Sequence, residues 1–255
     1  MNIGVTGATG RMGRTVIETA AEREDTVAFA ATRDPDGMTV RGVDFHPAED
    51  FEEHLAETTP DVIVDFTGPE SSVSYARAAA GAGVPIVIGT TGFSEGQLEA
   101  LEAAGRETPV LLGANFARGV QALVDAVRAA VSSLPGYDVE LTETHHNGKR
   151  DAPSGTAGVL LEGIESARGS QAEHVHGREG EAPREVNEIG VHARRAGDVT
   201  GEHEVLLAGN EEVLELTHRA GSRSVFAAGA LDAAAWLVDQ PAGFYRFAEV
   251  AGEIA

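Results

Sequence analysis

Residues 144–156, with the sequence THHNGKRDAPSGT, bring together the side chains best suited to proton chemistry. They contain the adjacent pair His145 and His146 and the only lysine of the chain, Lys149. A histidine can donate a proton near neutral pH, and a lysine can donate one or neutralise a substrate anion. Because arginine replaces lysine everywhere else, the retained ammonium indicates a task that the wider guanidinium cannot perform.

The same stretch ends in Gly155 and Thr156, where we expect a helix to begin. The backbone N–H groups of a helix start can hold a carboxylate. Two histidines, a lysine and this helix start suit a small, multiply charged acid as substrate. We expect no metal at His145 and His146. Adjacent residues on a strand point to opposite faces, and no acidic residue stands at a standard metal-ligand spacing from these histidines.

A second candidate site is the glycine-rich turn GATGRMG at residues 7–13, between the first apolar run and the first expected helix. Glycines there let the backbone approach a pyrophosphate, whose charge the helix start stabilises. The spacing is G-x-x-G-x-x-G rather than the commoner G-x-G-x-x-G. The turn therefore predicts a bound dinucleotide.

Three later segments extend this prediction. Thr32 stands where dinucleotide folds usually carry a carboxylate for the ribose hydroxyls, while its neighbour Arg33 can pair with a phosphate. The turns at residues 89–93 and 113–116 follow apolar runs. Because loops at the carboxyl ends of parallel strands face the ligand crevice, we expect these turns to line it.

The elements that must position these residues follow two patterns. Through residues 1–116, short apolar runs alternate with helix-like segments, which predicts an α/β class with a Rossmann-like doubly wound parallel sheet. From residue 117 a long helix precedes strands with alternating polarity, which predicts an α+β domain over residues 117–221. We expect residues 172–186 to form a loop and the helix at 222–238, with the tail to 255, to return to the first domain.

Composition excludes several classes of partner. The 41 acidic against 19 basic residues give a net charge of −22, which disfavours nucleic acid and anionic membranes. The chain has no cysteine, hence no disulfide and no thiolate chemistry. No segment reaches the roughly 18 apolar residues of a membrane span, so we expect a cytoplasmic protein. The acidic, lysine-poor composition is typical of adaptation to high salt.

The chain resembles the dihydrodipicolinate reductase family, whose motifs occur in order as GATGRMGR, DFTGPE, GTTGF, ANF, ETHHNGK, DAPSGT, RAGDVTGEH and HRAGSR. The resemblance implies an N-terminal domain for NADPH and/or NADH and a C-terminal substrate-binding and oligomerisation domain. It also implies a homotetramer and the reduction of 4-hydroxy-tetrahydrodipicolinate to tetrahydrodipicolinate in diaminopimelate and lysine biosynthesis.

By motif, the resemblance assigns His145 as catalytic acid or base and Lys149 as second proton donor or electrostatic stabiliser. It assigns His146, Gly155 and Thr156 to substrate binding. The positions matching cofactor contacts lie in four segments: Gly7, Ala8, Thr9, Gly10, Arg11 and Met12; Arg33; Gly89, Thr90 and Thr91; and Gly113, Ala114, Asn115 and Phe116. Asn147 and Gly148 stand where the family often has a bulkier, basic pair, and Thr32 replaces a common glutamate, which leaves the choice between NADH and NADPH open.

Three alternatives remain to be compared with this reading. A short-chain reductase or epimerase would need a tyrosine three residues before its lysine, where this chain has His146. A semialdehyde dehydrogenase would need a cysteine nucleophile. A non-catalytic NAD(P)H-sensing module would explain the glycine turn but not the cluster of His145 and Lys149.

Overall fold

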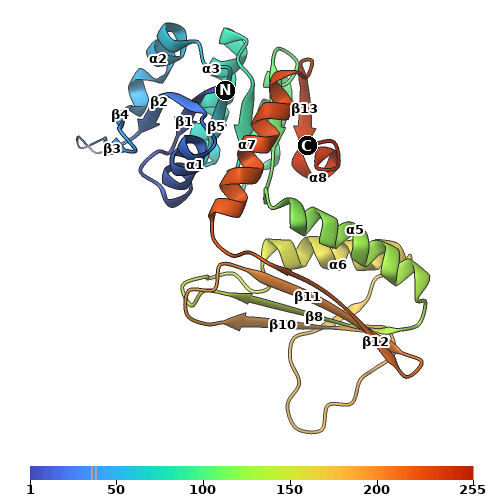
Figure 1. Ribbon diagram of the computed structural model, residues 1–255. Helices are drawn as coiled ribbons and strands as arrows, with labels where there is room; N and C mark the ends of the chain where they lie inside the picture. Colours follow the sequence, from blue (N-terminus) through green and yellow to red (C-terminus); the bar gives the residue numbers. More distant parts are fainter. Residues whose placement is uncertain (36, 38, 255) are drawn as a thin grey trace. The chain divides into compact units, whose positions relative to one another are not determined.

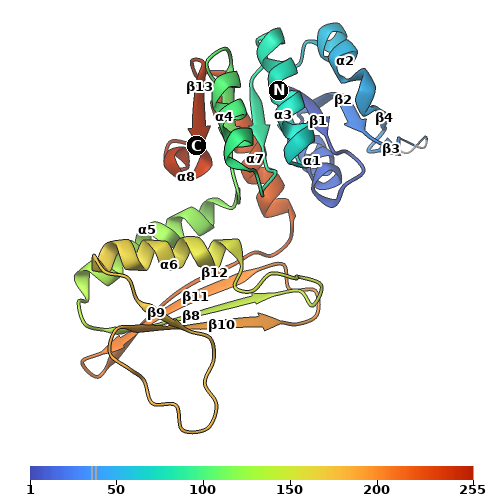
Figure 2. The same cartoon turned by 180° about the vertical axis from the view of Figure 1, so that it is seen from behind.

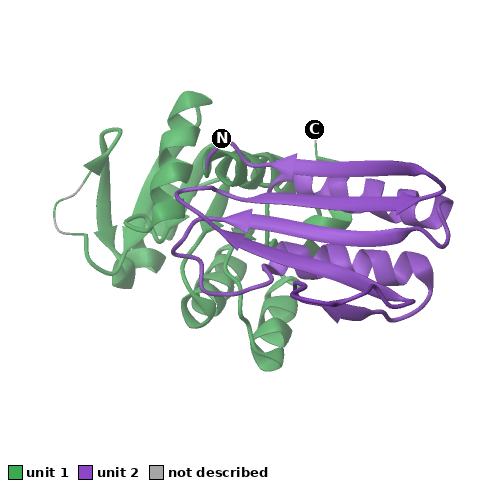
Figure 3. Ribbon diagram, turned by 90° about the horizontal axis from the view of Figure 1, so that it is seen from below, with its two compact units in different colours: residues 1–116, 223–255 green, residues 117–222 purple. Residues whose placement is uncertain are grey.

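The computed structural model describes residues 1–35, 37 and 39–254, which divide into two compact units (Figure 3). Unit 1 comprises residues 1–116 and 223–255, and unit 2 comprises residues 117–222. The predicted α/β class is confirmed, with a doubly wound sheet in unit 1 and a mixed α+β arrangement in unit 2. No helix among the described residues is long and apolar enough to cross a membrane.

Unit 1 is built on a sheet with eight strands in its described part, in the order β13-β7-β6-β5-β1-β2-β4-β3 (Figure 1). All neighbouring pairs are parallel except β3 and β4. The middle residues of the central strands, such as Ile63 and Val64 of β5, are apolar and buried, as expected for a sheet covered on both faces. The strands are β1 Asn2–Thr6, β2 Thr26–Thr32, β3 Thr39–Val40, β4 Val43–Pro47, β5 Val62–Asp65, β6 Ile86–Ile88, β7 Pro109–Leu112 and β13 Gly243–Arg246.

Helices cover the two faces of this sheet. In Figure 1, α1 and α7 lie in front of it, and in Figure 2 the opposite face carries α3 and α4. Each face has its own core of buried side chains, such as Ile17 and Leu231 on one side and Ala76 and Leu101 on the other. The helices are α1 Arg11–Glu22, α2 Phe51–Thr58 after a short 3-10 turn at Ala48–Asp50, α3 Pro69–Ala82, α4 Glu95–Ala104, α7 Ser224–Val238 and α8 Phe247–Val250.

Unit 2 is a mixed sheet in the order β12-β11-β8-β10-β9, with β8 parallel to β10 and antiparallel to β11. Alternate residues of β8, such as Val139 and Leu141, pack under the helices, and the residues between them lie on the open face. The elements are α5 Arg118–Ser133, β8 Asp138–His145, α6 Gly155–Arg168, β9 Glu173–Val175, β10 Glu188–Arg195, β11 Glu202–Gly209 and β12 Glu212–Arg219.

Some local predictions are corrected by the structure. The expected loop at residues 172–186 contains a short edge strand, β9, that pairs with β10. Helix α3 begins at Pro69, and proline is favourable at the first helical position. The tail contributes β13, which extends the parallel sheet beside β7.

Candidate active site

The glycine turn at residues 7–13 of unit 1 packs so closely against neighbouring backbone that Gly7 and Gly13 have no room for a side chain. Gly7 has φ +74°, and a Cβ on it would lie 2.6 Å from the carbonyl oxygen of Phe66. A Cβ on Gly13 would lie 2.2 Å from the carbonyl oxygen of Gly7, so only glycine lets α1 start against this turn. Gly10 is the N-cap of α1, with no side chain to cap the helix. The turn therefore offers a backbone cradle at a helix N-terminus, which fits a pyrophosphate.

The other predicted cofactor positions of unit 1 lie where its parallel strands end. Thr32 closes β2, and its hydroxyl lies 2.6 Å from that of Thr9 in the glycine turn. Gly89 follows β6 and Gly113 follows β7. A Cβ on either would clash with an aromatic ring behind it, of Phe66 and Phe116 respectively.

Not all of these positions can contribute a side chain. Ala8 and the Phe116 ring are buried in the core, where Phe116 packs edge-on against Phe66 and Phe247, so only backbone atoms of these two residues can face a ligand. Thr90 is also buried, and its hydroxyl joins the cluster around Asp65.

Asp65 was not predicted from the sequence. Its buried carboxylate accepts hydrogen bonds from the hydroxyls of Thr6 (2.5 Å), Thr67 (2.7 Å) and Ser72 (2.5 Å). Burial raises the pKa of the Asp65 carboxyl, and the hydroxyl hydrogen bonds only partly offset this rise. The cluster ties the ends of β1 and β5 to the turn that carries Thr90.

In unit 2, the centre of the candidate site is His145, the last residue of β8. Its Nδ1 lies 2.6 Å from a carboxylate oxygen of Glu143, which is two residues earlier and therefore on the same face of the strand. The Glu143 side chain is 0% exposed and accepts two hydrogen bonds of 2.8 Å from Arg195 of β10. Such bidentate arginine pairs are strong and orient both partners.

The start of α6 is tied to the same carboxylate. The backbone N–H of Ser154 donates to Glu143 at 3.1 Å, and the Ser154 hydroxyl caps α6 by accepting from the N–H of Ala157. Gly155 and Thr156 are the first two residues of α6. A Cβ on Gly155 would meet nothing within 4 Å, so the space beside it is open.

His203 of β11 completes the cluster. Its ring packs edge-on against that of His145, with centroids 5.2 Å apart, and its Nε2 lies 3.1 Å from the Ser154 hydroxyl. Burial and, to a smaller extent, the charges of His145 and Lys149 lower the pKa of His203 to about 4. His203 is therefore neutral at physiological pH.

Lys149 lies in the turn that follows β8. Its backbone N–H donates to the carbonyl of His146, and its ammonium forms an ion pair of 2.9 Å with Asp151. This hydrogen bond lowers the pKa of Asp151. The structure thus gathers His145, Lys149 and the α6 start at one end of β8, and sequence reasoning missed Glu143, Ser154, Arg195 and His203 around them.

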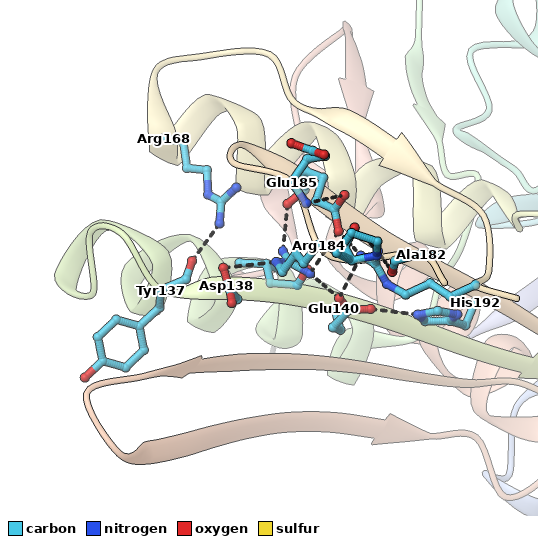
Figure 4. A network of polar contacts seen from close by, with 12 residues as sticks. Tyr137, Asp138, Glu140, Arg168, Ala182, Arg184, Glu185 and His192 are labelled. Carbon is cyan, nitrogen blue, oxygen red and sulfur yellow. Dashed lines mark hydrogen bonds and ion pairs between the residues drawn. The ribbon is translucent and has the colours of Figure 1, made fainter. Parts of the chain in front are cut away.

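Figure 4 shows a second group of the same residue types. It lies on the opposite face of β8, because Glu140 and Glu143 are three residues apart on the strand. There Glu140 forms an ion pair with Arg184, and His192 of β10 places Nε2 2.7 Å from the other carboxylate oxygen. A Cβ on Gly190 would collide with this carboxylate, so the glycine leaves room for it. Glu140 is 28% exposed, in contrast to Glu143.

Comparisons with known proteins agree across the chain. Residues 1–116 match the family model described as "Dihydrodipicolinate reductase, N-terminus", and residues 119–251 match "Dihydrodipicolinate reductase, C-terminus". The 4-hydroxy-tetrahydrodipicolinate reductase of Natronomonas pharaonis is 54% identical over 97% of this chain and 98% of the relative. That of Haloarcula marismortui is 53% identical over the same shares.

A solved structure shares the fold. The dipicolinate-bound dihydrodipicolinate reductase from Paenisporosarcina sp. TG-14 aligns with a TM-score of 0.81 over 98% of this chain and 99% of that chain. The two sequences are 22% identical, so this likeness concerns the fold alone.

Proposed function

The chain belongs to the dihydrodipicolinate reductase family, and from this premise we propose how its residues carry out the NAD(P)H-dependent reduction of 4-hydroxy-tetrahydrodipicolinate to tetrahydrodipicolinate. The observation that carries the proposal is the meeting of His145, Lys149 and the α6 start at the end of β8, in a chain that both family models cover. Unit 1 binds the dinucleotide and unit 2 binds the dicarboxylate.

In unit 1 the glycine turn holds the pyrophosphate through backbone N–H groups at the start of α1. The fit is supported by the close packing at Gly7 and Gly13, where a Cβ would occupy space that the cradle requires. When bound, the nicotinamide supplies the hydride. Residues after β6 and β7 line the crevice through their backbones, and Arg33 is available to a 2′-phosphate.

In unit 2 the α6 start, at Gly155 and Thr156, binds one carboxylate of the substrate, and His146 contributes to the same pocket. His145 donates the proton that accompanies the hydride. Lys149 supplies positive charge beside the developing anion, and its ion pair with exposed Asp151 gives way to the substrate. Dipicolinate, the ligand named for the Paenisporosarcina protein, is expected to bind here as a stable analogue.

The test is a coupled assay in which dihydrodipicolinate synthase generates the unstable substrate and NADPH oxidation is followed. Lys149→Ala is expected to lower kcat by about 100-fold, as for general acid catalysts, with NADPH affinity retained. Lys149→Arg is expected to stay impaired, because the guanidinium has a different shape. Arg150→Lys, next in the chain, is the matched control and should keep normal turnover. Full turnover by Lys149→Ala would refute this role, and a wild-type enzyme that binds NADPH without oxidising it would favour a sensing module.

Cofactor choice depends on Arg33 in this proposal. Thr32 lacks the carboxylate that would repel a 2′-phosphate, and the Arg33 guanidinium can pair with that phosphate. Arg33→Ala should weaken NADPH by about 1.5–3 kcal/mol, the usual worth of a hydrogen bond to a charged group, and leave NADH almost unchanged. Arg11→Ala, at the start of α1, is the control, since a pyrophosphate contact affects both cofactors alike. We would measure kcat/KM for both cofactors at one salt concentration; equal losses in Arg33→Ala would contradict the assignment.

We also propose that the chain works in the cytoplasm, where it uses the cellular NAD(P)H pool.

We further propose that the chain forms a homotetramer through unit 2. The sheet of unit 2 has one face without α5 or α6, and its edge strand β12 carries Val213 at 59% exposure. An apolar side chain on such a face is suited to burial against another copy. Light scattering should give the mass of four chains, and Val213→Glu should lower it. A monomeric wild type would contradict the proposal.

A further inference from the structure

The two ring nitrogens of His145 have different surroundings. Nδ1 is 2.6 Å from the carboxylate of Glu143, inside the cluster. Nε2 lies next to Gly201, where a Cβ would stand only 3.1 Å away. The absence of a side chain at Gly201 therefore leaves space at Nε2, while Nδ1 is committed to a protein group.

The protonation state of Glu143 decides which nitrogen of His145 carries a proton. Burial acts to raise the pKa of this carboxyl, but the hydrogen bonds and charges of Arg195 and His145 outweigh it and hold the pKa below its usual value. Glu143 is therefore ionised at neutral pH. An ionised carboxylate only accepts hydrogen bonds, so Nδ1 of His145 must be the donor.

Hydrogen bonds from neighbouring groups fix the orientation of the Glu143 carboxylate. Arg195 donates to both of its oxygens and also to the carbonyls of Asp151 and Arg194, which anchors the guanidinium to the loop and to β10. The N–H of Ser154 donates to the oxygen that does not face His145. Arg195 of β10 and Ser154 at the start of α6 thus together hold Glu143 in one orientation.

The charged groups around His145 support one protonation pattern. Arg195 comes from β10 and Lys149 from the following turn, where Asp151 pairs with it. His203, packed on His145 from β11, stays neutral and so adds no second cation beside the ring. Glu143 is the negative group in direct contact with the imidazole.

We propose that Glu143, held by Arg195, is a positioning residue that keeps a proton on Nδ1 of His145 so that Nε2 alone exchanges the catalytic proton. The proposal rests on the role proposed above for His145. In the reaction, the 4-hydroxyl group of the substrate leaves as water, the hydride then brings an electron pair to the substrate ring, and the Nε2 proton neutralises the charge that results. His145 is left neutral with its Nδ1 proton in place, and solvent returns a proton to Nε2.

The first test is a double-mutant cycle in the coupled assay with Glu143→Gln, His145→Ala and the double variant. Glutamine keeps the size of the side chain but can donate from its amide, which permits the other tautomer. We expect Glu143→Gln to lower kcat about 100-fold, by analogy with the loss of general acid catalysis, with NADPH affinity kept. In the His145→Ala background the same change should cost less than about threefold, because a residue acting through His145 has nothing left to position.

The matched control is Glu140→Gln on the same strand. It changes the same residue type beside an arginine and a histidine, on the open face shown in Figure 4. It should leave kcat within about twofold of wild type, because Glu140 lies on the face of β8 opposite to His145. Equal kcat losses in Glu140→Gln and Glu143→Gln, or an undiminished effect of Glu143→Gln in the His145→Ala background, would overturn the proposal.

The second test needs no substitution in the observed enzyme. Long-range ¹⁵N–¹H spectra of the wild type, with His145 assigned by comparison with His145→Ala, report the tautomer directly. We expect the neutral ring to carry its proton on Nδ1, and a proton on Nε2 instead would overturn the proposal. This reading holds whether or not the coupled assay detects turnover. A wild type that has the expected tautomer but no turnover would refute the proposed function and leave the positioning by Glu143 standing.

Discussion

The two faces of β8 carry the same three residue types with different consequences. On the helix-covered face, Glu143 is 0% exposed, contacts His145 and Arg195, and is tied to the α6 start through Ser154. On the open face, Glu140 is 28% exposed and contacts His192 and Arg184. Arg184 also donates to the carbonyl groups of Val139 in β8 and of Glu188 at the start of β10. The comparison teaches that a carboxylate, an arginine and a histidine do not make a reactive site by themselves. The group around Glu143 differs in its burial and in its connection to the start of α6.

The largest expected difference between the two faces is in turnover. His145→Ala should lower kcat by about 10²- to 10⁴-fold, the usual contribution of a general acid. His192→Ala removes the same ring from the open face and should leave kcat within about twofold of wild type. The coupled assay measures both. Comparable losses would mean that the open face also takes part in the reaction.

The next difference is in stability. Glu143→Ala leaves Arg195 without its buried partner and should lower the free energy of unfolding by about 3 kcal/mol. Glu140→Ala removes a partly exposed carboxylate and should cost about 1 kcal/mol or less. Urea unfolding of both variants gives the two values. Similar losses would show that burial does not separate the two groups energetically.

The pH dependence of stability sharpens the comparison further. The pKa of His203 is about 4 in the folded chain against an ordinary 6.5, so below pH 6.5 the unfolded chain binds a proton that the folded chain does not. The free energy of unfolding should therefore fall by about 2 kcal/mol between pH 7 and pH 5 through this residue alone. Glu143, whose pKa is lowered, keeps its contribution in this range and loses it only at more acidic pH.

Urea unfolding at pH 7 and pH 5 checks this expectation. His203→Asn should remove about 2 kcal/mol of the fall. His192→Asn, from the open face, serves as the control and should keep it. A fall that is the same in His203→Asn and wild type would contradict the assignment of the pH effect to His203.

The smallest expected difference concerns salt. At molar salt the Debye length is about 3 Å, which screens exposed charges far more than buried ones. The stability cost of Glu140→Gln, about 1 kcal/mol or less at low salt, should therefore shrink in molar KCl, while that of Glu143→Gln persists. The net charge of −22 should also make the wild-type unfolding midpoint rise with salt. A flat wild-type midpoint would mean that the acidic surface has another cause.

Much of the fold and part of the site could be predicted from the sequence. The apolar runs of unit 1 identify its central strands, and the family motifs identify the reductase class. Roles for His145 and Lys149 stay predictions, although their closeness along the chain made them easy to find. Glu143 could have been found too, because it lies two residues before His145 on a strand whose other alternate positions, Val139 and Leu141, are apolar.

Arg195 and His203 could not be found in this way. They meet β8 through strand pairing, with Arg195 opposite His145 in β10 and His203 opposite Glu143 in β11. Arg195 is 52 residues from Glu143 in the chain. The register of distant strands follows from how whole faces pack, and a shift by one residue would turn each side chain to the other face. The short strands β9 and β13 were missed because three or four residues carry too little periodicity.

The return of the chain to unit 1 also sets the order in which the two units can be completed during translation. Unit 1 contains residues 1–116 and 223–255, with α7 side chains such as Ala230 and Leu231 fully buried in one of its cores. A Cβ on Gly229 would lie 1.8 Å from the carbonyl oxygen of Phe116, so α7 packs closely against the backbone where the first segment of unit 1 ends. During synthesis the ribosome therefore releases the whole of unit 2 before the first sheet can bury its exposed apolar face. The core and the sheet of unit 1 therefore stay incomplete until α7 and β13 have been translated.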